Sequence, residues 1–253
     1  MPKQLLDFTG QVVVITGGRS GIGRATAIAF ARQGAKVVIA GRSHADETLR
    51  AIKDEGGEAV FVPTDVSIAA DVQKLIKAAL DTYGRLDVAF NNSGLLPVTA
   101  NLVEQTEADF DKIMAVDLKG LFLCMKYQIP EMLKAGGGAI INCGSVVSLV
   151  ADPGMSPYVA AKHGAAGLTK AAALEYAQSN VRINAICPGF TETEMTKGWM
   201  ENLQMRELIK SFNATNRIAT PDEIAGIVLF LASPMASFIT GAVIPVDGAQ
   251  TAH

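Results

Sequence analysis

Short runs of β-branched residues alternate with longer helical patterns along the sequence, and this alternation restricts the chain to very few folds. Strands that are joined through helices pair in parallel with right-handed crossovers, and helices then cover both faces of the sheet. The strands of such a sheet are apolar on both faces, as these runs are. We predict seven strands, at residues 12–15, 36–40, 59–62, 86–90, 139–143, 181–186 and 242–246.

Helical patterns fill the intervals between the predicted strands. We predict helices at residues 22–33, 44–55, 72–83, 106–134 and 158–178, with irregularities in the fourth, and a last helix from Pro221. No break in composition divides residues 1–253, so we expect a single α/β domain built on a doubly wound, seven-stranded parallel sheet. Ligands of such sheets bind beyond the carboxyl ends of the strands, so the residues that follow each strand are the candidates for chemistry.

The charge balance excludes several classes of partner. The chain has 22 Lys and Arg against 25 Asp and Glu, a net charge of −3, and no basic block. Phosphate backbones and anionic membranes attract basic patches, so we expect no nucleic acid and no membrane as partner. The apolar part of stretch 224–246 ends at Ser233-Pro234, short of the about 20 apolar residues that a spanning helix needs.

The cysteine pattern bears on the compartment. Cys124, Cys143 and Cys187 are far apart and form no CxxC pair, so we predict neither disulfides nor a zinc cluster. No set of His, Cys or carboxylate residues has the spacing of metal ligands, and no metal is expected. Asp7 and Gly10 lie where an export signal would need an apolar run. We therefore expect reduced thiols and a cytoplasmic location.

A glycine-rich turn, residues 16–23, joins the first predicted strand to the first helix. Gly17, Gly21 and Gly23 let backbone N–H groups approach a pyrophosphate, and the helix N-terminus attracts anions. The spacing Gly-x3-Gly-x-Gly differs from the Gly-x-Gly-x2-Gly pattern of many dinucleotide sites. Alone, the turn therefore fits either a phosphate cradle or a plain connection.

The end of the second predicted strand indicates which dinucleotide would bind. Gly41 stands about where a carboxylate would hold the ribose 2′-hydroxyl of NAD, and it cannot do so. Arg42 and Arg19 could instead flank a 2′-phosphate, because a guanidinium matches phosphate oxygens. The alternative is that both arginines are solvated surface charges. We predict NADP(H) in preference to NAD(H).

A phenol and an ammonium follow the fifth predicted strand. Tyr158 and Lys162 are four residues apart at the start of a helix and share one face. A free tyrosine titrates near pH 10, and the lysine cation is expected to lower that pKa toward neutrality. Ser145, directly after the strand, can offer a hydroxyl to the same substrate oxygen. A Tyr-x3-Lys pair by itself is more often a structural decoration of a helix.

The turn, Ser145 and the Tyr158/Lys162 pair together resemble the short-chain dehydrogenase/reductase family, and the likeness extends over essentially the whole chain. The other matching motifs are Asp65-Val66 after the third strand, Asn91-Asn92-Ser93-Gly94 after the fourth, and Pro188-Gly189 followed by Thr193. The resemblance implies a Rossmann-type fold and an oxidoreductase that transfers a hydride between a nicotinamide cofactor and a ketone or secondary alcohol.

The same resemblance assigns roles to individual residues. Tyr158 would exchange the proton, Ser145 would orient the substrate oxygen, and Lys162 would tune Tyr158 and hold the nicotinamide ribose. The residues that it places around the cofactor are Gly17, Arg19, Ser20, Gly21, Ile22, Gly23, Arg42, Ser43, Asp65, Val66, Asn91, Asn92, Gly94, Tyr158, Lys162, Pro188, Gly189, Thr191 and Thr193.

Two positions depart from the family pattern. Ser93 replaces the usual alanine, which we expect to matter little. Asp117, grouped here with the catalytic residues, stands where the family usually has an asparagine whose backbone helps to hold a water relay to the lysine. A buried Asp is costly to ionise unless it is paired. It could be protonated, could form an ion pair with Lys162, or could preserve the relay through its backbone carbonyl; we favour the last.

Residues 191–212 interrupt the strand–helix rhythm with a mixture of apolar and charged residues, among them Met195, Trp199 and Phe212. We predict a mobile lid over a partly apolar substrate; a plain amphipathic surface helix is the alternative. The alanine-rich helix 158–178 is similar to the family's dimer-forming helix and predicts a homotetramer, although alanine's helix propensity alone could explain its composition.

The general function expected is that of a carbonyl reductase or alcohol dehydrogenase acting on a small molecule. A 3-oxoacyl-carrier-protein reductase and a sugar or cyclic-alcohol dehydrogenase are alternatives within the same enzyme class. A protein of a different class, a non-catalytic redox sensor that binds NADP, is also compatible with the cofactor motifs. The joint presence of Ser145, Tyr158 and Lys162 argues against the sensor.

Overall fold

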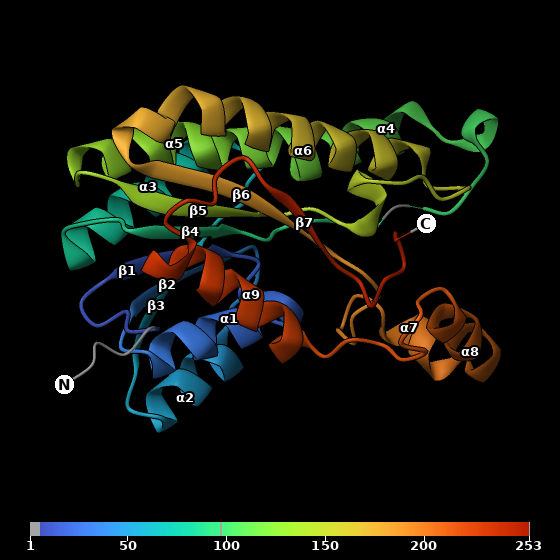
Figure 1. Cartoon of the computed structure of the whole chain (residues 1–253), viewed down its shortest axis with the longest axis horizontal. Coiled ribbons are helices and arrows are strands. Elements are labelled where there is room, and N and C mark those ends of the chain that lie inside the picture. Colours follow the sequence, from blue (N-terminus) through green and yellow to red (C-terminus); the bar gives the residue numbers. More distant parts are fainter. Residues whose placement is uncertain (1–5, 97, 253) are drawn as a thin grey trace.

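The computed structural model describes residues 6–96 and 98–252. Within them, seven strands form one parallel sheet in the order β3-β2-β1-β4-β5-β6-β7 (Figure 1). The strands are β1 (Val12–Thr16), β2 (Lys36–Gly41), β3 (Glu58–Pro63), β4 (Val88–Asn91), β5 (Gly138–Cys143), β6 (Val181–Pro188) and β7 (Val243–Val246). The predicted fold class is therefore confirmed.

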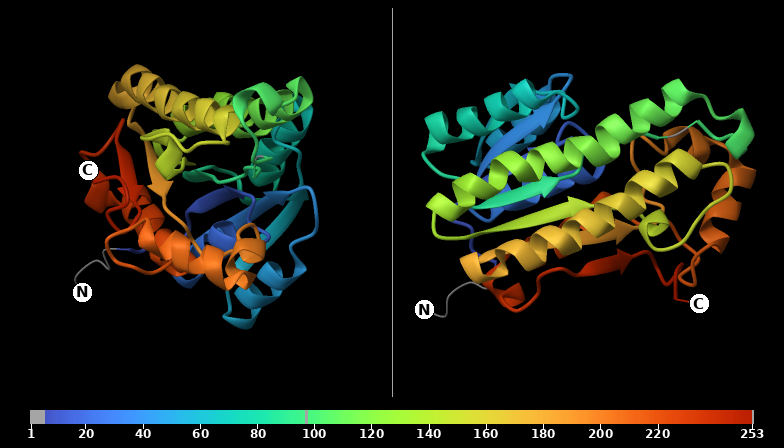
Figure 2. Two further views of the ribbon diagram at one scale, coloured as in Figure 1. Left: turned by 90° about the vertical axis from the view of Figure 1, so that its right-hand side faces the viewer. Right: turned by 90° about the horizontal axis from the view of Figure 1, so that it is seen from above.

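Helices cover both faces of the sheet. One face carries α1 (Gly21–Arg32), α2 (Asp46–Asp54) and α9 (Pro221–Ala232), and the other carries α3 (Ala69–Tyr83), α5 (Gly120–Lys134) and α6 (Ser156–Tyr176) (Figure 1). The short helix α4 (Glu107–Ile113) precedes α5, whereas α7 (Lys197–Glu201) and α8 (Leu203–Ser211) lie beyond one end of the sheet (Figure 2). None of the helices described is both long and apolar enough to cross a bilayer.

The irregularity expected in the long fourth helix is a π-helical turn. Met114–Lys119 separates α4 from α5, and Asp117 lies buried inside that turn. A π turn holds one extra residue and is frequent at functional sites, because it redirects the side chains of the helix. A second irregular feature of this region is Pro130, which lies inside α5.

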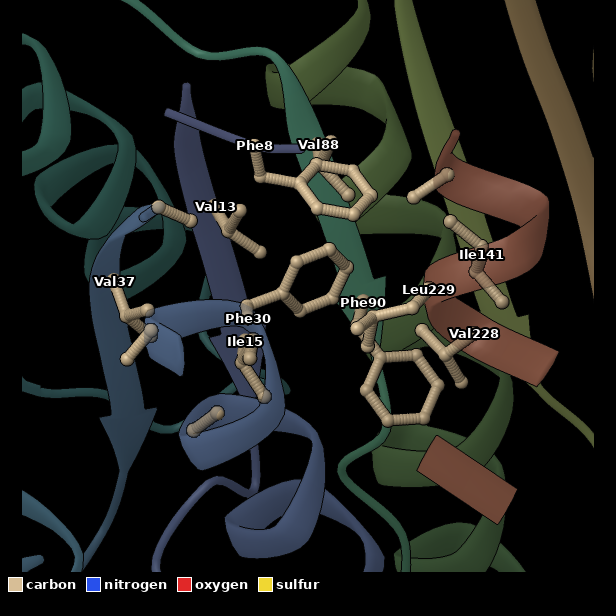
Figure 3. Packing of buried hydrophobic residues seen from close by; sticks show 14 of the residues in the cluster. Phe8, Val13, Ile15, Phe30, Val37, Val88, Phe90, Ile141, Val228 and Leu229 are labelled. Atoms are coloured by element: carbon tan, nitrogen blue, oxygen red, sulfur yellow. The ribbon is translucent and has the colours of Figure 1, made fainter. Parts of the chain in front are cut away.

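The two larger hydrophobic clusters, one on each face of the sheet, hold these layers together. In the cluster beneath α1 and α9, the rings of Phe8 and Phe30 meet edge to face with centroids 4.8 Å apart (Figure 3). All five residues of β1 are buried, because β1 lies inside the sheet with helices on both sides. Burial of apolar area of this kind supplies most of the stabilising free energy of the fold.

The order of the strands fixes where a ligand can bind. β1 pairs with β2 on one side and with β4 on the other. The strands up to β3 therefore extend the sheet in one direction from β1, and the strands from β4 onward extend it in the opposite direction. The crevice at such a reversal is the usual ligand site of doubly wound sheets. Thr16 joins the end of β1 to the segment after β4, because its Oγ1 accepts hydrogen bonds from the backbone N–H groups of Asn92 and Ser93, both at 3.0 Å.

Candidate active site

The turn after β1 is shaped by its glycines. Gly17 and Gly21 have φ of +69° and +53°, a region that side-chain-bearing residues rarely adopt. A Cβ at Gly17 would lie 2.9 Å from Asn92 Nδ2, and a Cβ at Gly23 would collide with the carbonyl oxygen of Gly17. The turn therefore closes tightly against the segment that follows β4.

The N-terminus of α1 presents backbone donors that this structure leaves uncapped. Ser20 is the N-cap residue, and its side chain makes no capping hydrogen bond to the first turn. The first N–H groups of a helix need an outside acceptor, and a negatively charged group is the favoured one. They open into a cavity of about 540 Å³ that runs along the carboxyl ends of the strands.

Most of the predicted site residues line this cavity. They are Gly17, Arg19, Ser20, Gly21, Ile22, Arg42, Ser43, Asp65, Val66, Asn92, Gly94, Ser145, Tyr158, Lys162, Pro188, Gly189, Thr191 and Thr193. Asn91, Gly23 and Asp117 do not line it. Gly23 lies behind the turn, where it allows the close contact with Gly17.

Asn91 requires a correction, because its side chain belongs to the protein core. It is buried in the last position of β4, and its Nδ2 donates to Gln128 Oε1 and Asn142 Oδ1, both at 3.0 Å. Gln128 Nε2 donates back to Asn91 Oδ1 at 2.8 Å. This amide network occupies the polar atoms of the Asn91 side chain, which therefore does not line the cavity, whereas Asn92 does.

The groups proposed to be catalytic converge at one place in the cavity. The Lys162 ammonium lies 5.4 Å from the centroid of the Tyr158 ring, and the Ser145 hydroxyl interacts with the Tyr158 phenol. Ser145 is fixed by a short helical turn after β5, in which its Oγ accepts from the N–H of Val147 at 3.4 Å. Lys162 Nζ also donates to the carbonyl oxygen of Cys143 at 3.1 Å.

The pKa of Tyr158 does not follow the expectation from sequence. Burial raises it above its ordinary value, and the nearby Lys162 ammonium opposes this rise without reversing it. The negative charge of Asp117 adds to the rise. Removal of a phenol from water disfavours the phenolate, an effect that the Tyr-x3-Lys spacing alone does not reveal.

Asp117 makes direct use of its carboxylate. Oδ1 lies 3.2 Å from Lys162 Nζ in a buried ion pair, while Oδ2 accepts a hydrogen bond from the Leu95 N–H at 3.0 Å. Burial raises the pKa of Asp117, and Lys162 partly offsets that effect. Burial alone would lower the pKa of Lys162, but the charges of Tyr158 and Asp117 outweigh it and raise that pKa. The favoured interpretation, a role through the backbone alone, is incomplete.

The ion pair also explains a glycine. A Cβ on Gly94 would lie 2.8 Å from Asp117 Oδ1 and 3.5 Å from Lys162 Nζ. Gly94 therefore lets the segment after β4 pass close to the charged pair. Through the Leu95 N–H bond, Asp117 links that segment to the lysine.

The end of the cavity near β2 carries exposed cationic groups. Arg19 and Arg42 line it together with Gly41. Ser67, which donates to Asp65 Oδ1 from both its hydroxyl and its N–H, holds the pKa of that carboxyl below its usual value, and Arg42 contributes to the same effect. A Cβ at Gly41 would have no neighbour closer than 3.7 Å. The structure therefore has room for a side chain at this position, although the sequence places no carboxylate there.

The opposite end is largely apolar and is closed by the segment that follows β6. Phe190 packs against Trp199 of α7 and against Phe212, with ring centroids 5.9 Å and 6.0 Å apart. Sequence reasoning did not single out Phe190, Val147, Asp152 or Glu194, all of which line the cavity. Their closeness in sequence to Ser145, Tyr158 and Thr193 was the available signal.

The cysteine thiols do not provide a nucleophile. Burial raises the pKa of Cys143 to about 11 and that of Cys124 to about 12, so both stay protonated near neutrality. Within residues 6–96 and 98–252, no group of three or more His, Cys, Asp or Glu residues is placed to share a metal ion.

A family model described as enoyl-(acyl carrier protein) reductase matches residues 17–251, nearly the whole chain. The chain belongs to the short-chain dehydrogenase/reductase family. Members of this family act on alcohols and ketones, and the present chain is an oxidoreductase of that kind. The resemblance seen in the sequence motifs therefore reflects membership of this family.

Individual members of the short-chain dehydrogenase/reductase family resemble the chain closely. A cyclohexanol dehydrogenase of Acinetobacter sp. (strain SE19) is 39% identical over 248 residues, which cover 96% of each chain. A cis-4-hydroxycyclohexanecarboxylate dehydrogenase of Sinomonas cyclohexanicum is 40% identical over 246 residues, covering 97% of this chain and 98% of that protein. The crystal structure of a putative 2-deoxy-D-gluconate 3-dehydrogenase from Agrobacterium tumefaciens, with bound NADP, has a TM-score of 0.92 and 34% identity and covers 99% of this chain and 100% of that chain.

The cavity of this short-chain dehydrogenase/reductase fits a nicotinamide dinucleotide. Side chains at Gly17 or Gly23 would collide with Asn92 or with the Gly17 carbonyl, so the glycines keep the turn after β1 tight, and the uncapped N-terminus of α1 offers donors to a pyrophosphate. Asp65 and Val66 border the same cavity on the side of β3, where the adenosine half would lie. Pro188, Gly189 and Thr191 border it on the side of β6, close to Tyr158.

Proposed function

We propose that the protein is an NADP(H)-dependent oxidoreductase that interconverts a ketone and a secondary alcohol, with Tyr158 as the proton donor and acceptor. The observation that carries the proposal is the convergence of Tyr158, Lys162 and Ser145 in one cavity with the glycine turn and Arg42. A dinucleotide laid along this cavity would bring its nicotinamide end to the phenol. The bound cofactor would supply or accept the hydride.

The protein's own groups would stabilise the charge that develops on the substrate oxygen. When a carbonyl carbon receives a hydride, its oxygen becomes negative, and two hydroxyl donors, Ser145 and Tyr158, can hydrogen-bond to it. Tyr158 would then release its proton to that oxygen, and the ammonium of Lys162 would stabilise the phenolate that remains. In the oxidising direction the phenolate takes up the proton of the alcohol.

The preference for NADP(H) rests on the exposed end of the cavity. Gly41 offers no carboxylate to a ribose 2′-hydroxyl, whereas Arg19 and Arg42 offer guanidinium groups to a 2′-phosphate. A bound NADP in a structural relative supports the same choice. A non-catalytic NADP sensor is the second candidate. Burial of the charged side chains of Lys162 and Asp117 costs free energy, and this argues against a sensor, because a sensor needs neither charge.

The experiment is a panel of cyclic and linear ketones and alcohols, assayed in both directions with NADP(H) and with NAD(H). We expect turnover with at least one substrate, and a loss of about 10³-fold or more in kcat for Tyr158→Phe, because a positioned acid–base group contributes about 10²–10⁴. Cofactor binding without turnover on any substrate would favour the sensor.

The cofactor assignment is tested with the same panel. Arg42→Ala should raise KM for NADPH by about 10-fold to 100-fold, since a hydrogen bond to a charged group contributes roughly 1.5–3 kcal/mol. KM for NADH should change little. An equal loss for both cofactors would contradict the role given to Arg42.

We further propose a cytoplasmic homotetramer. The thiols of Cys124, Cys143 and Cys187 are free, as in a reducing compartment. An apolar groove between the π turn, α5 and α6, lined by Leu118, Phe122 and Leu168, supplies a surface for a second copy. Phe238, fully exposed in the connection that precedes β7 and not part of that groove, supplies a second apolar surface.

A further inference from the structure

The charges that line the cavity change sign from one end to the other. At the end near β2, the positive side chains of Arg19 and Arg42 outnumber the one carboxylate there, Asp65. At the other end, the connections that follow β5 and β6 contribute two carboxylates, Asp152 and Glu194. Of the described residues that line this second end, Lys162 is the one basic residue.

The charge of Lys162 is already matched inside the protein. Asp117 lies 3.2 Å from its ammonium, and both side chains are almost completely buried. Lys162 therefore offers little net positive potential to a substrate. On the lid, Lys197 and Arg206 are exposed and lie outside the cavity lining. The substrate end is left with the negative charges of Asp152 and Glu194.

Asp152 is held in place although its carboxylate is free. Two residues further on, the Gly154 carbonyl accepts hydrogen bonds from the Ala100 N–H at 3.1 Å and from Gln105 Nε2 at 3.2 Å. These bonds fasten the connection after β5 to the segment after β4. Asp152 is half-buried, and among the residues described nothing forms a hydrogen bond or an ion pair with its side chain or with Glu194.

We infer that the substrate end of the cavity selects uncharged alcohols and ketones and rejects substrates that carry a carboxylate or phosphate, with Asp152 as the main specificity-determining residue. The inference rests on the oxidoreductase function proposed above. An anionic substrate would lose part of its hydration among Val147, Met155 and Trp199 and would gain no cation in exchange. It would also face a fixed like charge, which is a common way to exclude a competing ligand.

Asp152 contributes more than Glu194 for a physical reason. Glu194 is exposed, so water and salt screen its charge. Asp152 is partly withdrawn from water, and its charge acts through a medium of lower effective dielectric constant. The same argument disfavours acyl groups carried on a phosphorylated arm, since the arm's phosphate would have to avoid both carboxylates.

The test compares substrates that differ in one charge. The alcohol cis-4-hydroxycyclohexanecarboxylate and its neutral carboxamide have nearly the same shape, and a relative is named for oxidising the former. We expect kcat/KM for the carboxamide to exceed that for the carboxylate by about tenfold or more, which corresponds to ~1.4 kcal/mol. Asp152→Asn should reduce this ratio at least fivefold, and Glu194→Gln should reduce it less.

A matched control removes one negative charge far from the cavity. Asp54 lies exposed at the end of α2, so Asp54→Asn should leave the ratio unchanged. In the parent enzyme, salt raised from about 0.01 M to about 0.5 M should weaken only the part of the discrimination that Glu194 provides, because salt screens exposed charges. A ratio near one in the parent, or a ratio that Asp152→Asn leaves intact, would overturn the inference.

A binding measurement separates this inference from the proposed catalysis. Cyclohexanecarboxamide and cyclohexanecarboxylate have no hydroxyl to oxidise, and calorimetry can measure their binding to the protein saturated with NADP⁺. We expect the carboxamide to bind about tenfold more tightly, and Asp152→Asn to narrow the gap. Equal affinities, tighter binding of the carboxylate, or no binding of either would overturn the inference, whether or not the protein turns over any alcohol.

Discussion

Asp117 stands beside the lysine in a position where the family's asparagine would provide the same backbone groups. Its carboxylate pairs with Lys162 through one oxygen and accepts a hydrogen bond from the Leu95 N–H through the other. An asparagine amide has one acceptor oxygen and could make only one of these two contacts. Its negative charge also raises the pKa of Tyr158, which burial already raises. The groups that face the phenol are Lys162, Asp117, Cys143 and Ser145, and of these the lysine and the carboxylate carry charge.

Removal of that charge should change the pH dependence of the reaction. In Asp117→Asn the pKa of Tyr158 falls, because the contribution of the carboxylate to its rise is lost while Lys162 still favours the phenolate. In the proposed mechanism oxidation requires the phenolate, so the increase of kcat with pH should move to lower pH, and kcat near pH 7 should stay equal or increase. The measurement is the pH profile of kcat in the oxidising direction.

The comparison for this variant is Asp54→Asn, which changes an exposed carboxyl at the end of α2 and should leave the profile in place. A profile that moves to higher pH in Asp117→Asn would contradict the electrostatic argument. A fall of more than tenfold in kcat, in a variant of normal stability, would mean that the carboxylate has a chemical role of its own.

At the scale of single residues, the sequence identified most of the cavity lining but not the direction of every side chain. Asn91 and Asn92 both appeared to follow the predicted strand, which was expected to end at Phe90. β4 continues to Asn91, and successive residues of a strand point to opposite faces, so Asn91 enters the core and Asn92 reaches the cavity. The pKa of Tyr158 was equally beyond the sequence, because it depends on enclosure by several distant segments.

The elements themselves were easier to predict, since hydrophobic periodicity is a local signal. Strands and helices lie within a few residues of their expected positions, and the long fourth helix contains the irregularity that was expected. The sequence could not show that this irregularity is a π turn or that it brings Asp117 against Lys162. Both depend on how α5 and α6 pack, which no local pattern specifies.

The segment 191–212 offers an element-scale test, because Trp199 on α7 is the only tryptophan of the chain. Its ring packs on Phe190 and lines the cavity. If this segment closes over ligands, the emission of Trp199 should shift or be quenched when NADP⁺ and then a neutral alcohol are added. Trp199→Phe provides the blank, and its kcat/KM should fall about 3-fold to 30-fold, because the loss of aromatic packing loosens the closed state.

An emission spectrum that neither ligand changes would contradict the closing motion. The segment would then be a fixed wall of the cavity, in line with the amphipathic surface helix that was the alternative interpretation. A change with NADP⁺ alone would mean that the nucleotide is sufficient to order α7.

For the whole molecule, the apolar groove between the π turn, α5 and α6 predicts association with a second copy. Phe122 is 45% exposed at this groove, and Phe238 is fully exposed elsewhere. Large apolar side chains in such positions mark interaction surfaces. Phe122→Glu should therefore convert a tetramer into dimers that use the remaining surface, as measured by light scattering after size-exclusion chromatography.

The control for this variant is Ile68→Glu, since Ile68 is 50% exposed before α3 and is not among the residues that line the groove. It should leave the molar mass unchanged. A parent protein that is monomeric at micromolar concentration would refute the tetramer, and an unchanged mass in Phe122→Glu would place the contacts on another face.

The opposite ends of the cavity are built by different parts of the chain. Turns after β1, β2 and β3 form the end with the arginines, whereas the connections after β5 and β6 supply the end with the two carboxylates. Natural selection can therefore alter one end by point changes in two surface connections while the other end, and the proposed proton-transfer groups between them, stay as they are. A scaffold divided in this way can evolve toward new substrates while its cofactor end is conserved.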